Sequence, residues 1–147
     1  MTFKNYLSIK KEIQEKLISL LMNEDDQKQS HIKDFIKKLD DLKIREDKNE
    51  FKSFLYLLYH ISNNHYQSPT LYDTIEKILL SFTNEFKSHL TNEEIFNIFE
   101  NNKKILLLLI QQKILVLDQK IVDRMITKNT YKNYFINEIK PFITDDL

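Results

Sequence analysis

The sequence lacks glycine, alanine, cysteine and tryptophan altogether, and its only prolines are Pro69 and Pro141. Glycine lets the backbone approach a phosphate closely or take a positive φ without strain. Its absence therefore excludes Walker-type phosphate loops, dinucleotide-binding fingerprints and the usual nucleophile elbow. The absence of cysteine excludes disulfides, thiolate nucleophiles and zinc sites built on sulfur. This composition is typical of an A/T-rich genome, so it does not by itself indicate selection for rigidity.

The charge balance and the short apolar runs of the sequence limit which partners and which cellular locations we expect for the protein. The 22 lysines and arginines are balanced by 22 aspartates and glutamates, so no net field attracts nucleic acid or membrane. Charged residues interrupt the N-terminal stretch, which excludes a signal peptide. The longest apolar run, residues 105–110, is far shorter than the roughly twenty residues that span a bilayer. We expect no membrane association and an intracellular, cytoplasmic location, with attachment to the cytoskeleton as a further hypothesis.

Apolar residues recur at the spacing of one helix face through most of the chain. The pattern predicts helices over residues 3–22, 30–42, 47–63, 69–86, 91–100, 103–113, 118–126 and 130–140. Thr91 and Glu94 have the spacing of a capping box, which marks the start of one of these helices. Residues 114–117 are expected to form an extended connector between two of them.

Asparagines stand where glycine would usually end a helix. Six asparagines lie at predicted helix ends, namely Asn23, Asn63, Asn64, Asn101, Asn102 and Asn129. Asparagine is the commonest residue after glycine to take the left-handed conformation of a helix cap, so we expect it there. The helical pattern therefore holds together without glycine.

The pattern as a whole predicts an all-α fold of about eight helices in antiparallel pairs, because the connections between helices are short. With 147 residues and 41% hydrophobic composition, the chain can bury one core. We expect a single helical domain over residues 1–147. The polar stretch LKIREDKNE predicts a minor boundary near residues 43–50, between an N-terminal helical pair and the remainder.

Four segments of the chain resemble known proteins: ISNNHYQSP (61–69), IEKILLSF (75–82), EEIFNIFENNKKILLLLI (93–110) and YFINEIKPFI (134–143). Their order and spacing resemble a helical domain of unknown function that lies N-terminal to ankyrin repeats in large protist ankyrin-repeat proteins. The resemblance covers residues 51–143, and the stretch 91–122 is similar to a degenerate ankyrin repeat. It implies ankyrin-like or α-solenoid stacking in the C-terminal two thirds, in proteins that bind other proteins. In those proteins ankyrin repeats follow EIKPFI, whereas this sequence ends at Leu147, so we expect the ankyrin binding surface to be absent.

Aromatic and amide side chains gather near the predicted end of the third helix. Stacked tyrosines bind single-stranded nucleic acid when basic groups lie beside them. Here Lys52 is the only basic residue between positions 51 and 75, which favours packing or protein contact instead. The candidate protein-contact residues are Tyr56, Tyr59, Asn63, Asn64, His65 and Tyr66.

Motifs for catalysis or metal binding are missing. The histidines are scattered and lack the HExxH spacing of zinc enzymes. They are His31, His60, His65 and His89. None of the serines lies in a nucleophile motif, and neighbouring carboxylates on a helix point in different directions. We therefore predict that the protein is not an enzyme and has no catalytic residue, no metal ligand and no cofactor.

The leading hypothesis is a non-catalytic module for protein–protein interaction or scaffolding, with other proteins as partners. Its most specific form is a small structural component of a larger assembly, such as a cytoskeletal array. Two alternatives stay open, namely a helical ligand-binding or enzymatic domain with an unrecognised site, and a weak nucleic-acid binder that uses the basic C-terminal third. The scarcity of arginine disfavours the second alternative. We expect the apolar run at residues 105–110 to be core, or an interface if it is exposed.

Overall fold

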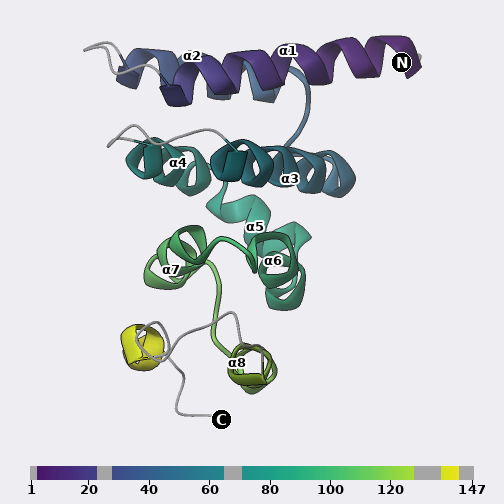
Figure 1. Cartoon of the computed structure of the whole chain (residues 1–147). Coiled ribbons are helices and arrows are strands. Elements are labelled where there is room, and N and C mark those ends of the chain that lie inside the picture. The colour runs from purple at the N-terminus through teal and green to yellow at the C-terminus, as the bar shows by residue number, and fades with distance from the viewer. Residues whose placement is uncertain (1–2, 23–27, 65–70, 128–136, 143–147) are drawn as a thin grey trace. The chain divides into compact units, whose positions relative to one another are not determined.

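A computed structural model of the chain describes residues 3–22, 28–64, 71–127 and 137–142. Across these residues the predicted all-α fold is confirmed (Figure 1). The chain divides into two compact units, Met1–Phe82 and Thr83–Leu147. The polar stretch 43–50 lies inside the first unit, and the division between the units follows the fourth helix.

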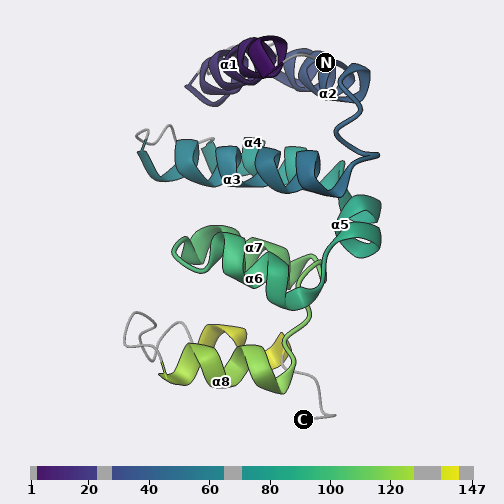
Figure 2. The same cartoon turned by 90° about the vertical axis from the view of Figure 1, so that its right-hand side faces the viewer.

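The first unit contains α1 (Phe3–Met22), α2 (Lys28–Asp41), α3 (Lys48–Asn64) and α4 (Leu71–Leu80). Figure 1 and Figure 2 both show α1 and α2 as one layer, with α3 and α4 as the next. α1 contacts each of the other three helices, and α2 also contacts α4. The apolar face of each helix turns inward, as helical spacing predicts. Fully buried side chains include Leu17, Leu21, Leu39, Phe51, Leu55, Leu58, Ile75 and Leu79.

Phenylalanine rings join the helices of this unit. The ring centroid of Phe82 lies 5.6 Å from that of Phe51 and 5.6 Å from that of Phe54. Phe54 in turn lies 6.2 Å from Phe35 on α2. Tilted aromatic pairs at such distances contribute about 0.5–1.5 kcal/mol each beyond the burial of their area. α2, α3 and the end of α4 are therefore held together by contacts between rings.

The prediction of one continuous helix over residues 69–86 is wrong, because the chain leaves the helix at Ser81 and Phe82. α4 ends there, and α5 (Thr83–His89) begins directly afterwards. The Ser81 hydroxyl donates to the Ile78 carbonyl at 2.6 Å, and the Phe82 amide makes an i→i−3 bond of 3.0 Å. Such a hydroxyl bond and a tightened last turn both compete with the regular helix pattern.

Arg45 stabilises this break from the connection between α2 and α3. Its Nη1 donates to the Ser81 carbonyl at 2.7 Å. In a continuous helix that carbonyl would accept from the amide four residues later. The guanidinium carbon of Arg45 lies 4.3 Å from the centroid of the Phe82 ring, and the side chain also forms an ion pair with Asp40. One arginine therefore joins the end of α2 to the end of α4.

The second unit contains α5, α6 (Asn92–Phe99), α7 (Lys103–Gln111) and α8 (Gln119–Thr127). α6 contacts both α7 and α8. Of the predicted last helix, residues 130–136 lie outside the described residues, while residues 137–139 are helical and lead into a 3₁₀ turn at Lys140–Phe142. The ankyrin-like stacking expected of the C-terminal two thirds stays a prediction.

Side-chain caps begin three helices of the second unit, α6, α7 and α8. Thr91 Oγ1 accepts from the Glu94 amide at 3.1 Å, and the Glu94 carboxylate accepts from the Thr91 amide at 3.1 Å. The predicted capping box is thereby confirmed. Asn102 Oδ1 accepts from the Ile105 amide at 3.1 Å at the start of α7, and Asp118 caps α8 after the connector at residues 114–117. A cap of this kind is worth about 1 kcal/mol.

The apolar run at residues 105–110 belongs to the core of the second unit. Leu107 is half-buried and the other five side chains are buried. A helix that is apolar all round is expected at the centre of a core, and α7 occupies such a position. The condition for the alternative, an interface at an exposed run, is not met, because none of these six side chains is exposed.

Arg124 connects α8 to both ends of α6. Its Nη1 lies 3.8 Å from a carboxylate oxygen of Glu93, and its Nη2 lies 3.6 Å from one of Glu100. Its guanidinium carbon lies 4.8 Å from the centroid of the buried Phe96 ring. The two arginines of the chain therefore make the same kind of contact, one in each unit.

Lysines, rather than asparagines, take the left-handed backbone conformation at helix ends. Among the described residues, positive φ occurs at Lys43 (59°) and Lys113 (60°). The prediction of left-handed asparagines is thus wrong at Asn63, Asn64, Asn101 and Asn102. The other two predicted positions, Asn23 and Asn129, lie outside the described residues. Asn102 has an extended φ of −125°, because it begins α7 instead of ending α6.

Both lysines belong to the same type of helix end. After α2, the Ile44 amide donates to the Leu39 carbonyl at 3.3 Å and the Lys43 amide donates to the Asp40 carbonyl at 3.0 Å. This is the Schellman pattern, and α7 repeats it around Lys113. The residue after each lysine, Ile44 or Ile114, is buried. Burial of that isoleucine offsets the strain of about 1–2 kcal/mol that a left-handed lysine carries.

Replacing Lys43 or Lys113 with glycine is expected to raise the free energy of unfolding by about 0.5–1 kcal/mol. Glycine has no Cβ strain at positive φ, although it gains more entropy in the unfolded chain. Urea denaturation followed by circular dichroism measures the change. The control, Lys11→Gly inside α1, should lower stability by about 1 kcal/mol. If all three substitutions lowered the free energy of unfolding equally, the left-handed strain inferred at Lys43 and Lys113 would be contradicted.

Replacing Arg45 with lysine is expected to lower the free energy of unfolding by about 1–2 kcal/mol. Lysine keeps the charge but cannot stack a planar guanidinium on Phe82 while it donates to Ser81. Urea denaturation measures the loss against Lys11→Arg, an exposed control that should change stability by less than about 0.5 kcal/mol. An unchanged midpoint in the Arg45→Lys variant would show that the stacked contact is unimportant.

Candidate functional site

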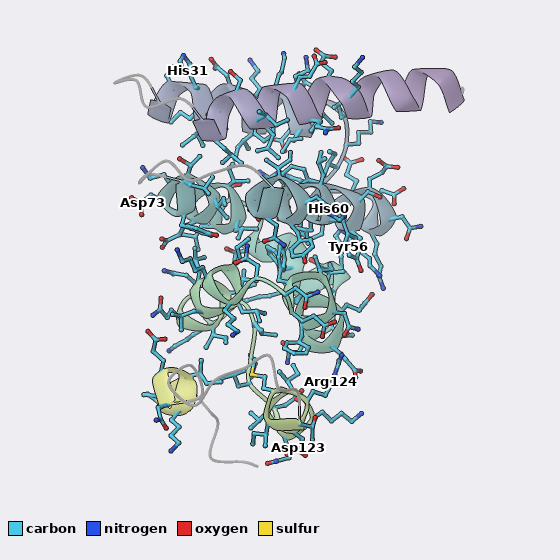
Figure 3. All side chains as sticks on the ribbon, in the orientation of Figure 1. His31, Tyr56, His60, Asp73, Asp123 and Arg124 are labelled. Carbon is cyan, nitrogen blue, oxygen red and sulfur yellow. The ribbon has the colours of Figure 1, made fainter. Side chains whose placement is uncertain are left out.

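Three exposed side chains form a row along α3. Tyr56, His60 and Asn63 are separated by four and then three residues, so they lie above one another on one side of the helix. Figure 3 shows Tyr56 and His60 on this helix. Tyr56 keeps 41% of its surface exposed. We call these three residues the α3 row. The buried face of the same helix carries Phe51, Phe54, Leu55, Leu58 and Ile61.

The α3 row stands on a well-anchored helix. Asp47 begins α3 by accepting from the Asn49 amide at 2.8 Å. Tyr59, beside the row, is half-buried, and its ring centroid lies 5.3 Å from that of His60. The Ser62 hydroxyl donates to the Tyr59 carbonyl at 2.8 Å. A surface held this way loses little conformational entropy when another molecule binds to it.

The structure describes only some of the predicted protein-contact residues. Tyr56 and Asn63 are exposed and Tyr59 is half-buried, while Asn64 is the last residue of α3. The other two predicted residues, His65 and Tyr66, lie outside the described residues. His60 was not predicted as a contact residue. Its spacing of four from Tyr56 is the sequence signal that places it in the row.

A groove between α1 and α2 is a second feature, and nothing in the sequence predicts it. Its volume is about 290 Å³, and its lining residues are Lys16, Ser19, Leu20, His31, Asp34, Phe35 and Lys38. These residues come from two consecutive helices and are spread over residues 16–38, so no local motif indicates them. Cationic and anionic groups both line the groove, which therefore favours no ligand of one charge.

Two lysines share one carboxylate at this groove. Lys38 on α2 forms an ion pair with Glu12 on α1, and Lys16 Nζ lies 3.6 Å from the same Glu12 oxygen. The hydrogen bond from Lys38, together with its charge, lowers the pKa of the Glu12 carboxyl. Lys38 also lowers the pKa of the Lys16 ammonium, because a second cation nearby disfavours the charged form of Lys16. Exposed pairs of this kind orient α1 against α2 but contribute little to stability.

The histidines of the chain do not assemble into a metal site among the described residues. No group of three or more histidine, aspartate or glutamate side chains there is placed to hold a metal ion. His31 lies on α2 and His60 lies on α3, apart from each other (Figure 3). Within the same residues, no helix combines the length and apolarity needed to cross a membrane.

Comparisons with known proteins give no match. Models of known protein families do not match the sequence. Searches of curated proteins and of solved structures find no similar chain either. The resemblance to the helical region that precedes ankyrin repeats therefore stays a prediction.

Replacing Lys38 with methionine is expected to raise the pKa of Glu12 towards its ordinary value of 4.5, because Lys38 is the main cause of the lowered pKa. A lowered folded-state pKa means that this carboxylate supports folding above its unfolded pKa. That support is lost as pH falls through the folded pKa. Carboxyl-carbon NMR titration measures the pKa. The exposed control Lys11→Met should leave it unchanged, and a Glu12 pKa that also stays unchanged in the Lys38 variant would refute the ion pair.

Proposed function

We propose that this chain is a non-catalytic protein-interaction or scaffold module that uses the α3 row as a contact surface. The observation that carries the proposal is the exposure of Tyr56. Among the described residues, every phenylalanine whose burial is described is buried, and Tyr56 is the one aromatic side chain among the large apolar residues that stay exposed. Tyrosine is enriched in protein interfaces, because its ring buries a large area while its hydroxyl keeps a polar partner.

The neighbours of Tyr56 favour a protein partner over a nucleic acid. His60 and Asn63 supply hydrogen-bonding groups beside the ring, as an interface with an aromatic anchor and a polar rim requires. The only lysine or arginine in residues 51–64 of α3 is Lys52, which is half-buried. A phosphate backbone would need several cations along the same face.

The proposal extends to the setting in which the module works. It acts inside the cell, in the cytoplasm, as a small structural component of a larger assembly such as a cytoskeletal array. The predicted resemblance over residues 51–143 to a helical region of ankyrin-repeat proteins supports the same general role. In this proposal the protein has other proteins as partners and carries out no reaction of its own.

The double variant Tyr56→Ala/His60→Ala is expected to lose partner proteins that the unaltered chain retains. Loss of an aromatic anchor at the centre of an interface costs about 2 kcal/mol or more, which is about a thirtyfold loss of affinity. The full chain, expressed in its native cells and cross-linked before purification, is compared with the variant by quantitative mass spectrometry. Partners that contact the α3 row should fall at least tenfold in recovery.

The matched control for this experiment is Lys11→Ala/Gln14→Ala, which removes two exposed side chains from α1. This control should recover the same partners as the unaltered chain. The proposal fails if the Tyr56 variant and the control recover the same proteins in the same amounts, or if chaperones alone are recovered with the unaltered chain. Circular dichroism on all three proteins establishes that the variants are folded.

A further inference from the structure

A second groove lies between α2 and α4, within the first unit. Its volume is about 310 Å³, at the small end of the range for ligand pockets, which is about 300–1,000 Å³. Ile32 and Ile36 from α2 supply its apolar lining, with Ile32 buried and Ile36 half-buried. Leu80, three residues after Lys77 on α4, is 38% exposed and extends the apolar surface beside the groove. The groove can therefore take one or two apolar side chains of a binding partner.

Lysines from both helices surround this apolar lining. Lys33 and Lys37 stand one turn apart on α2, and Lys77 stands on α4. None of the three makes an ion pair with another described residue. The groove also contains Asp40, but the carboxylate of Asp40 is already paired with Arg45. The groove thus has a local excess of positive charge in a chain whose net charge is zero.

Asp40 is the one aspartate of α2 that lines this groove. Asp34 and Asp41 line a neighbouring groove together with Lys37 and Lys38, so Lys37 lines both grooves, whereas Lys33 and Lys77 line only the α2–α4 groove of these two. Three lysines and one aspartate therefore line the groove that has the apolar lining, whereas two lysines and two aspartates line its neighbour. A groove with an apolar lining and an excess of lysines favours a ligand that combines apolar groups with negative charge.

We infer that the groove between α2 and α4 docks an acidic amphipathic helix of a partner protein. An amphipathic helix presents apolar side chains at i, i+3 and i+4, with charged side chains on either side of them. Its apolar stripe fits the lining formed by Ile32 and Ile36. Its glutamates or aspartates meet Lys33 and Lys37 on one side and Lys77 on the other. This surface goes beyond the α3 row, because it is separate from that row and specifies the chemistry of its partner.

Selection of random peptides displayed on phage tests the inference without assuming a partner. The full chain is immobilised, and binders are counter-selected against Lys33→Glu/Lys37→Glu/Lys77→Glu. We expect enriched peptides with leucine, isoleucine or phenylalanine at helical spacing and with acidic residues between them. Fluorescence polarisation should then show affinity that falls about tenfold or more in the triple variant and that weakens as salt is added.

The control variant Lys11→Glu/Lys87→Glu/Lys120→Glu makes the same change of charge at exposed lysines elsewhere. It should keep the affinity for the selected peptide within about twofold. The inference is overturned if no acidic amphipathic peptide is enriched, or if both triple variants lose affinity equally. It is also overturned if the chain binds vesicles containing phosphatidylserine through these lysines and binds no peptide.

The failure of this inference can be told apart from failure of the α3 proposal. Tyr56→Ala/His60→Ala leaves the groove residues unchanged, so it should bind the selected peptide as the unaltered chain does. Peptide binding lost in the Tyr56 variant, with the fold intact, would show that the groove is not the docking site. Ile36→Ser removes apolar lining without altering charge and should lower the affinity for the selected peptide at least about fivefold.

Discussion

The contact of Arg45 with Phe82 is the interaction on which the first unit depends. The guanidinium lies against the ring, donates a hydrogen bond to the Ser81 carbonyl and forms an ion pair with Asp40. One side chain therefore makes three different contacts. It ends α4, it covers the phenylalanine cluster, and it pairs with Asp40, the one carboxylate in the lining of the α2–α4 groove. A lysine could supply the charge, but not a flat surface and a directed donor at once. Core packing and surface charge are therefore linked through one residue.

Arg124 shows that this use of arginine is not an isolated case. It lies against Phe96 in the second unit and faces two carboxylates, at the first turn and at the end of α6. The chain has two arginines against twenty lysines, and both arginines stand where a planar cation meets an aromatic ring. Most of the lysines whose burial the structure describes are exposed, where a flexible point charge is sufficient. Even in a composition that disfavours arginine, these two positions use it.

The structural features that depend on residues close together in the sequence could be predicted from the sequence. Helical spacing predicted the helices, and the Thr91–Glu94 capping box lies within one turn, so both could be read from neighbouring residues. The end of α4 could not, because it depends on Arg45, which lies 36 residues earlier. The exposure of Tyr56 and Asn63 followed from the apolar face of α3. The α2–α4 groove had no such signal, because it forms only when two helices distant in sequence come into contact.

The left-handed lysines explain how helices end without glycine. Intrinsic preference favours asparagine at such positions, yet Lys43 and Lys113 occupy them. In each case the next residue is a buried isoleucine, and the isoleucine can reach the core only if the lysine turns the chain there. Burial of such a side chain contributes about 1.5–3 kcal/mol, which exceeds the strain of about 1–2 kcal/mol at the lysine. Tertiary burial thus decides where these helices end, and the residue at the turn needs only a side chain that can remain in solvent.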